Sequence, residues 1–150
     1  MPLSRLAKSE LVLFALLGAH TLDHALNQPA RELPSGGGIV GLAGFALVAI
    51  AIVFALAGGR LAAPVGLGAG LGTLVGFAVV HLPGVGPLAD PYFEFSPNAI
   101  SWFLLAAPII ASVVVAALAV AELRSADRVA RGRRGSVTSA LPGEQAQRVG

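Results

Sequence analysis

The stretch that decides the fold is residues 39–57, which read IVGLAGFALVAIAIVFALA and contain no charged side chain. An α-helix of this length rises about 28 Å, close to the roughly 30 Å of hydrocarbon in a bilayer. A run this long and this apolar predicts a helix that crosses a membrane.

Three further apolar runs of similar length lie on either side of it, at about 9–28, 61–82 and 99–121. The whole chain is 55% hydrophobic and only 12% charged, whereas about 25% of residues are charged in ordinary soluble domains. We therefore predict an all-α integral membrane protein, a four-transmembrane-helix antiparallel bundle over residues 9–122. A short N-terminus (1–8) precedes the bundle, and a basic, disordered tail (123–150) follows it.

The cations predict the orientation of the bundle. Arg31 stands alone between the first two runs, and every other Lys or Arg lies on the opposite side. Because cytoplasmic loops carry an excess of Lys and Arg, we expect both termini in the cytoplasm. The composition, rich in Ala, Gly, Leu, Val and Arg with a single Lys, is typical of a GC-rich bacterial genome. The expected location is a bacterial inner membrane.

The third run carries small residues at every fourth position, which lets neighbouring helix backbones approach closely. Gly68, Gly72 and Gly76 form one ridge, and Ala62, Gly66 and Gly70 form another. We expect the third helix to pack on two sides. The ridge of Gly68, Gly72 and Gly76 is also a candidate contact for homo- or hetero-oligomers.

The chemistry is concentrated in the histidines. His20 and His24 are four residues apart, so they share one face of a helix, and Asp23 and Asn27 lie close to the same stripe. This spacing is the one that places two imidazoles on one metal ion. Ionisable groups inside a membrane span are costly, which makes them candidates for function. Asp23 would be a third ligand or the carboxylate that orients an imidazole.

His81 is the candidate partner from the third helix, at the same predicted end of the bundle. Counted from Glu10 and Arg60, the two histidine positions differ in height by roughly 10 Å, which tilt or a different starting depth would remove. Asp90 and Glu94, in the loop that follows, are weaker candidate ligands.

Imidazole and carboxylate donors without cysteine suit zinc, copper(II), iron or manganese. Three histidines also permit one haem with two histidine ligands. The leading prediction is a membrane protein that binds a metal ion or haem through His20, His24 and His81 near the extracytoplasmic side. One alternative is a non-catalytic accessory subunit, in which the histidines form an interhelical hydrogen-bond network. A proton relay and a metal-dependent lipid hydrolase are further alternatives, so the sequence leaves open whether the protein is an enzyme.

The basic tail is interpreted as a membrane-surface segment. Five arginines follow the fourth run closely, and each contributes about 1 kcal/mol near anionic headgroups. These arginines are Arg124, Arg128, Arg131, Arg133 and Arg134. The segment is short, lacks aromatic residues and adjoins a membrane span, so nucleic-acid binding is not expected.

Overall fold

The structure is a computed structural model that describes residues 2–27, 36–81 and 97–139. The chain forms four helices in these ranges, and no strand occurs in them. The helices are α1 (Arg5–Asn27), α2 (Gly36–Ala57), α3 (Ala62–His81) and α4 (Ala99–Ser139). The predicted all-α class with four helices is therefore confirmed.

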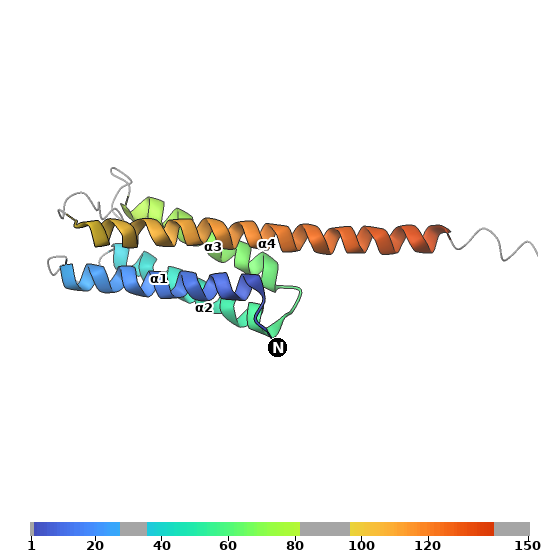
Figure 1. The fold of residues 1–150 in the computed structure, drawn as a ribbon, viewed down its shortest axis with the longest axis horizontal. Coiled ribbons are helices and arrows are strands. Elements are labelled where there is room, and N and C mark those ends of the chain that lie inside the picture. Colours follow the sequence, from blue (N-terminus) through green and yellow to red (C-terminus); the bar gives the residue numbers. More distant parts are fainter. Residues whose placement is uncertain (1, 28–35, 82–96, 140–150) are drawn as a thin grey trace, which may run out of the picture.

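The helices pack as a four-membered ring around one core (Figure 1). α1 contacts α2 and α4, and α3 contacts the same two helices from the other side, so α1 and α3 face each other across the diagonal. Figure 1 shows α1 beginning at the end of the bundle where α2 turns into α3, and α4 beginning at the opposite end. A residue near the end of α1 is therefore level with the end of α3 and the start of α4.

Polar caps and one glycine fix the helix ends. The hydroxyl of Ser4 accepts a hydrogen bond from the Ala7 amide at 3.0 Å, which satisfies a donor of the first turn of α1. The side-chain oxygen of Asn98 accepts hydrogen bonds from the amides of Ile100 and Ser101 and caps α4 in the same way. Gly58 ends α2 with a φ of 66°, a left-handed conformation that only glycine adopts at little cost.

A close approach between helix backbones occurs at Gly70 of α3. A Cβ atom at this position would lie 2.8 Å from the carbonyl oxygen of Ser112 and 2.9 Å from the amide nitrogen of Ala116, both in α4. Neither backbone atom can rotate away. Glycine is therefore required here, and the predicted close packing of the third helix is confirmed at this contact.

The ridge that contains Gly72 and Gly76 packs against α2 of the same chain. A Cβ atom at Gly72 would lie 2.7 Å from Leu47 of α2, and one at Gly76 would lie 3.3 Å from Val40 of α2. These two glycines therefore pack against α2, as expected of a third helix that packs on two sides. Gly68 has open space around its Cβ position.

α4 continues well beyond the bundle, which differs from the expected end of the span near residue 121 and the expected disorder from residue 123. The helix has 41 residues and extends to Ser139, and its last part projects past the other three helices (Figure 1). Ala, Leu, Glu and Arg, all good helix formers, dominate residues 121–131. The 2.6 Å ion pair between Arg131 and Asp127 spans one turn of this exposed segment. These local preferences explain why the helix continues without a bilayer or a core around it.

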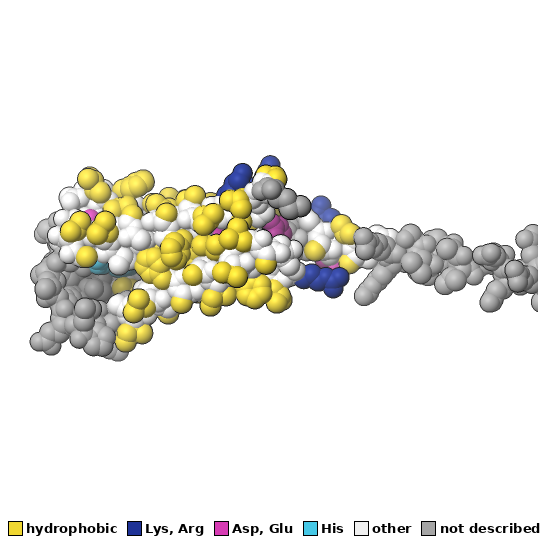
Figure 2. All heavy atoms as spheres, turned by 90° about the horizontal axis from the view of Figure 1, so that it is seen from below, with side chains coloured by type: hydrophobic (Ala, Val, Ile, Leu, Met, Phe, Trp, Pro, Cys, Tyr) yellow, Lys and Arg dark blue, Asp and Glu magenta, His cyan; other side chains and the backbone are white. Residues whose placement is uncertain are grey.

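Three helices are long and apolar enough to cross a membrane, namely Gly38–Ala57, Ala62–His81 and the Ala99–Gly132 part of α4. Their outward side chains include Leu42 of α2, which is 73% exposed. Hydrophobic side chains cover the visible face of the bundle, and Lys and Arg appear where α4 leaves it (Figure 2). These features indicate a membrane protein.

α1 is not among the three apolar helices, although the sequence analysis expected it to span the membrane. Its average hydropathy is lowered by polar residues such as Glu10, His20 and Asp23, and all three of these side chains are buried inside the bundle. An average over a helix does not distinguish side chains that face lipid from those that face protein. Membrane insertion of α1 therefore stays a prediction.

Candidate metal centre

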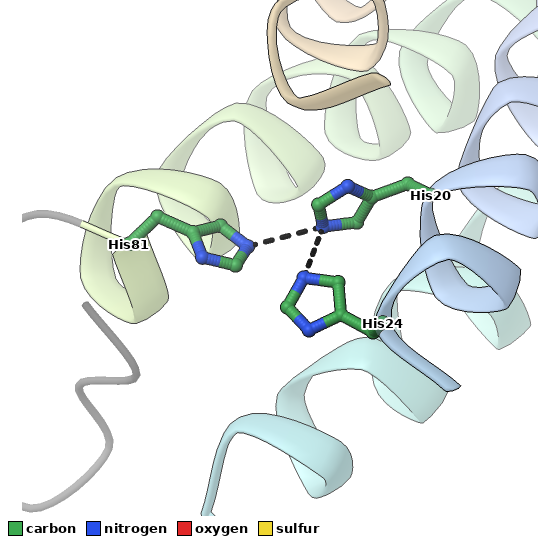
Figure 3. Close-up of side chains that lie close together, drawn as sticks. All are labelled: His20, His24 and His81. Carbon is green, nitrogen blue, oxygen red and sulfur yellow. Dashed lines mark hydrogen bonds between the residues drawn. The ribbon is translucent and has the colours of Figure 1, made fainter. Parts of the chain in front are cut away.

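The three histidines meet in one cluster at the end of the bundle, as the sequence analysis predicted. The Nε2 atom of His20 lies 3.2 Å from Nε2 of His81 and 3.0 Å from Nε2 of His24. One nitrogen from each ring lies within 4.8 Å of the other two. Figure 3 shows the rings of His20 and His24, from α1, and of His81, from α3, turned toward one another. His20 and His81 are buried, and His24 is half-buried.

His24 and His81 can meet because they lie equally far along α1 and α3. His24 follows Arg5, the first residue of α1, by as many residues as His81 follows Ala62, the first residue of α3. Each histidine therefore lies about 28 Å along its helix. The 10 Å offset expected from the sequence arose because α1 begins at Arg5, five residues before the assumed start at Glu10, and α3 begins at Ala62, two residues after the assumed start at Arg60.

Phe77 forms the apolar side of the cluster. It precedes His81 by about one turn of α3, and its ring centroid lies 4.9 Å from that of His20 and 5.3 Å from that of His81. Phe77 is itself 9% exposed. Its ring thus separates the imidazoles from the apolar middle of the bundle.

A proline in α4 leaves a carbonyl available to His20. Pro108 lies inside α4 and has no amide hydrogen, so the carbonyl of Leu104, four residues earlier, lacks its helical donor. The backbone of Leu104 lies near the ring of His20. The Nε2 atom of His20 is directed at the other histidines, so α4 is a third helix beside this ring.

Asp23 lies beside the cluster. It is buried, and its Oδ1 atom accepts hydrogen bonds from the side-chain amide of Asn27 at 2.7 Å and from the Ser101 hydroxyl at 3.1 Å. Its negative charge also acts on His20. Among the described residues, the group whose ligand atoms converge consists of the three histidines, and Asp23 lies beside it.

Two residues of α4 complete this support, and the sequence analysis did not identify either of them. Ser101 joins α4 to Asp23, and Asn98 caps α4 and binds the Ser101 amide at 3.0 Å. An Asn directly before the first residue of a helix is the local signal of a cap. Asp90 and Glu94, the weaker candidate ligands, lie outside the described residues.

No protein-family model, curated protein or solved structure matches this chain. The geometry and chemistry of the cluster therefore carry the functional argument.

Proposed function

We propose that His20, His24 and His81 bind one divalent transition-metal ion in the membrane-embedded bundle. The observation that supports this most directly is the convergence of three Nε2 atoms from two helices that otherwise touch little. Zinc sits about 2.0–2.1 Å from histidine nitrogens, so two ligands of a tetrahedral site are separated by about 3.3 Å. The separations of 3.2 and 3.0 Å are close to this value.

The surroundings of His20 and its neighbours also resemble those of a metal site. A histidine ligand usually donates its second ring N–H to a backbone carbonyl or a carboxylate, which fixes the ring and strengthens the metal bond. The Leu104 backbone and the charge of Asp23 lie near His20, where groups of this kind would act on a bound ion's ligand. The positive charge of a bound ion would in turn be offset by Asp23.

The donor set favours some metals over others. Three imidazoles without sulfur suit zinc, copper(II), iron or nickel, whereas manganese prefers carboxylate oxygens. A bis-histidine haem fits poorly, because its two axial nitrogens must lie on opposite faces of a flat macrocycle, and here the Nε2 atoms are next to each other. Three protein ligands leave a fourth position open, at which the ion would supply Lewis-acid chemistry.

The competing function is that of an accessory subunit held together by histidine hydrogen bonds. A neutral imidazole has one donor and one acceptor nitrogen, so His20 can bond to His24 or His81 without any ion. The same contacts then stabilise the crossing of α1 and α3, and metal has no effect on them. The two functions differ in whether the purified protein takes up an ion.

The deciding experiment is a titration of the full-length protein in nanodiscs with zinc and, as a spectroscopic substitute, cobalt(II). We expect one ion per chain, and absorption typical of four-coordinate cobalt. Because the chain has only these three histidines, every signal of ¹⁵N-histidine-labelled protein reports on the cluster, and zinc should shift the Nε2 signal of all three. Ser112→Ala, a buried change in α4 away from the cluster, is the control. Absence of uptake of either ion would assign the histidines to the accessory-subunit function.

We also propose that the cluster lies at the extracytoplasmic end of the bundle and that α1 spans the membrane. The cations Arg5, Lys8 and Arg60 belong to the opposite end, where α1 begins and α2 turns into α3. That distribution supports a cytoplasmic location for both termini. The chain has no cysteine, so single cysteines at positions 59 and 89 can be labelled without background. Labelling from the cytoplasm at 59 and from outside at 89 is expected, and the reverse pattern would invert the topology.

The projecting part of α4 is proposed to bind anionic lipid at the cytoplasmic surface. Arg124, Arg128 and Arg131 are exposed on it, and Arg133 and Arg134 follow on the same helix. Binding to vesicles with phosphatidylserine should weaken as salt rises, because the attraction is electrostatic. Neutral vesicles are the control.

A further inference from the structure

A second polar site lies in the core at the other end of α1. Glu10 is fully buried, and neither carboxylate oxygen has a hydrogen-bond partner within the described part of the chain. The side chain crosses the bundle toward α3, where a Cβ atom on Gly66 would lie 2.6 Å from its Oε1 atom. Glu10 precedes His20 by about 15 Å of helix. It is therefore separate from the histidine cluster.

Within the described part of the chain, no cationic side chain bonds to Glu10 to balance a carboxylate. α2 contains no titratable residue, and α3 contains only His81, at the far end. The charged group that acts on Glu10 from α4 is Glu122, which has the same sign. On α1 itself, Arg5 and Lys8 are exposed to the outside. An ionised carboxylate buried without a partner is strongly unfavourable, so Glu10 requires a bound cation.

The packing selects the smallest cation. Sodium, calcium and magnesium need several oxygen ligands arranged around them, whereas the carboxylate here lies against Gly66, whose Cβ position is also within 3.3 Å of the methyl groups of Leu6. A proton needs a single oxygen and no added space.

We propose that Glu10 is a proton-binding site of the bundle core, occupied at neutral pH and exchanging protons through the end of the bundle where Glu122 lies. Glu122 is exposed on α4 and near enough for its charge to act on Glu10, so it is a water-exposed carboxylate at the same end of the bundle. The site is independent of the histidines.

A buried hydroxyl, that of Thr73, lies between the Glu10 site and the histidines. Thr73 is 3% exposed, and its Oγ1 atom has no hydrogen-bond partner among the described residues. It is two helical turns beyond Gly66 on the same face of α3, about 10 Å closer to His81. Leu13 and Leu17 of α1 are buried at intermediate heights, and the buried Ser112 hydroxyl of α4 is bonded to the Pro108 carbonyl. Glu10 and the histidines are therefore separated by a largely apolar layer.

Infrared spectroscopy of the full-length protein in nanodiscs tests this proposal. A protonated carboxylic acid has a carbonyl band distinct from that of a carboxylate, and the band shifts when its proton exchanges for deuterium. We expect this band at pH 7, its disappearance at alkaline pH and its loss in Glu10→Gln. Glu122→Gln, an exposed change on α4, should keep the band. A wild-type spectrum without the band at pH 7, or an unchanged spectrum in Glu10→Gln, would overturn the proposal.

A second pair of variants keeps the test valid if Glu10→Gln fails to fold. Gly66→Ala places a methyl group against the carboxyl and should shift the frequency of the band, while Gly68→Ala, with open space at its Cβ position, should leave it unchanged. Equal spectra for both variants would contradict the assignment of the band to Glu10. Zinc uptake should persist in Glu10→Gln, so a failure of the metal site and a failure of the proton site are distinguishable.

Discussion

The buried polar groups at the two ends of the bundle differ in how many partners they have. At one end, His20 meets His24, His81 and the backbone of Leu104, and Asp23 is bonded to neighbouring side chains. At the other end, Glu10 lies alone among apolar atoms. A group with several partners is held in a fixed geometry, as metal coordination requires. A carboxyl group without such partners is suited to gaining and losing a proton. The same helix, α1, therefore carries a residue of the proposed proton site and two residues of the proposed metal site.

The largest expected effect is the loss of metal from histidine variants. His20→Ala should abolish stoichiometric zinc and cobalt uptake, because His20 is the ring that touches both others. Adding His81→Ala should change little more, since the first substitution has already destroyed the site. Metal content after equilibrium dialysis measures this. Full zinc uptake by the double variant would remove the contrast between the ends, because the histidine end would then hold no ion.

Acid should affect the two ends differently. A free imidazole has a pKa of about 6.5 and must be unprotonated to bind metal, so zinc affinity should fall at least about tenfold between pH 7 and pH 5. Protonation of the histidines next to Asp23 leaves the Glu10 end unchanged, because its carboxyl already holds a proton. Zinc titrations and the infrared band, followed over the same pH range, provide the comparison. An affinity that does not depend on pH would argue against histidine ligands.

The helix contacts between the two ends should affect the free energy of unfolding and leave metal binding unchanged. Gly70→Ala places a methyl group against the α4 backbone and should destabilise the bundle by about 1–3 kcal/mol. Gly68→Ala is the matched control on the same helix and should stabilise it by up to about 1 kcal/mol, because alanine is the better helix former. Unfolding in mixed micelles measures both. Equal stability of the two variants would remove the evidence for the close contact at Gly70.

The sequence was sufficient for the number of helices and for naming the three histidines as candidate ligands. Spacing along one helix shows that His20 and His24 share a face, but the heights of α1 and α3 decide whether His81 reaches them. Those heights depend on where Ser4 and Gly58 begin and end helices. The burial of Glu10 was missed for a related reason. It follows from the rotation of α1 toward Gly66, and the pattern of a single helix does not specify how that helix is rotated in a bundle.

A smaller effect is expected from Asp23→Asn. The substitution removes the negative charge that acts on His20 but retains an oxygen that can accept the Ser101 hydrogen bond. Loss of a supporting group of this kind weakens metal binding by about 10- to 100-fold. Isothermal titration with zinc measures the change, and Asn27→Ala, which removes one neighbour of Asp23 and no charge, is the control. A complete loss of zinc in Asp23→Asn would show instead that Asp23 is a ligand.

The smallest effect should come from Pro108→Ala. An amide at position 108 restores the helical donor to the Leu104 carbonyl, which then competes with His20. Zinc affinity should fall by at most about tenfold, the low end of the range for supporting groups, while the stability of α4 stays equal or rises. An unchanged affinity would show that the Leu104 backbone does not support the ring.

The continuity of α4 has a mechanical consequence. One helix runs from Ser101, next to Asp23, to the exposed Arg131 beyond the bundle, a distance of about 45 Å. Ser112 and Ala116 of α4 lie against Gly70 of α3 between these two ends, so α4 is held along the bundle. One continuous helix thus joins the buried Asp23 end of the bundle to the exposed arginines at the other end.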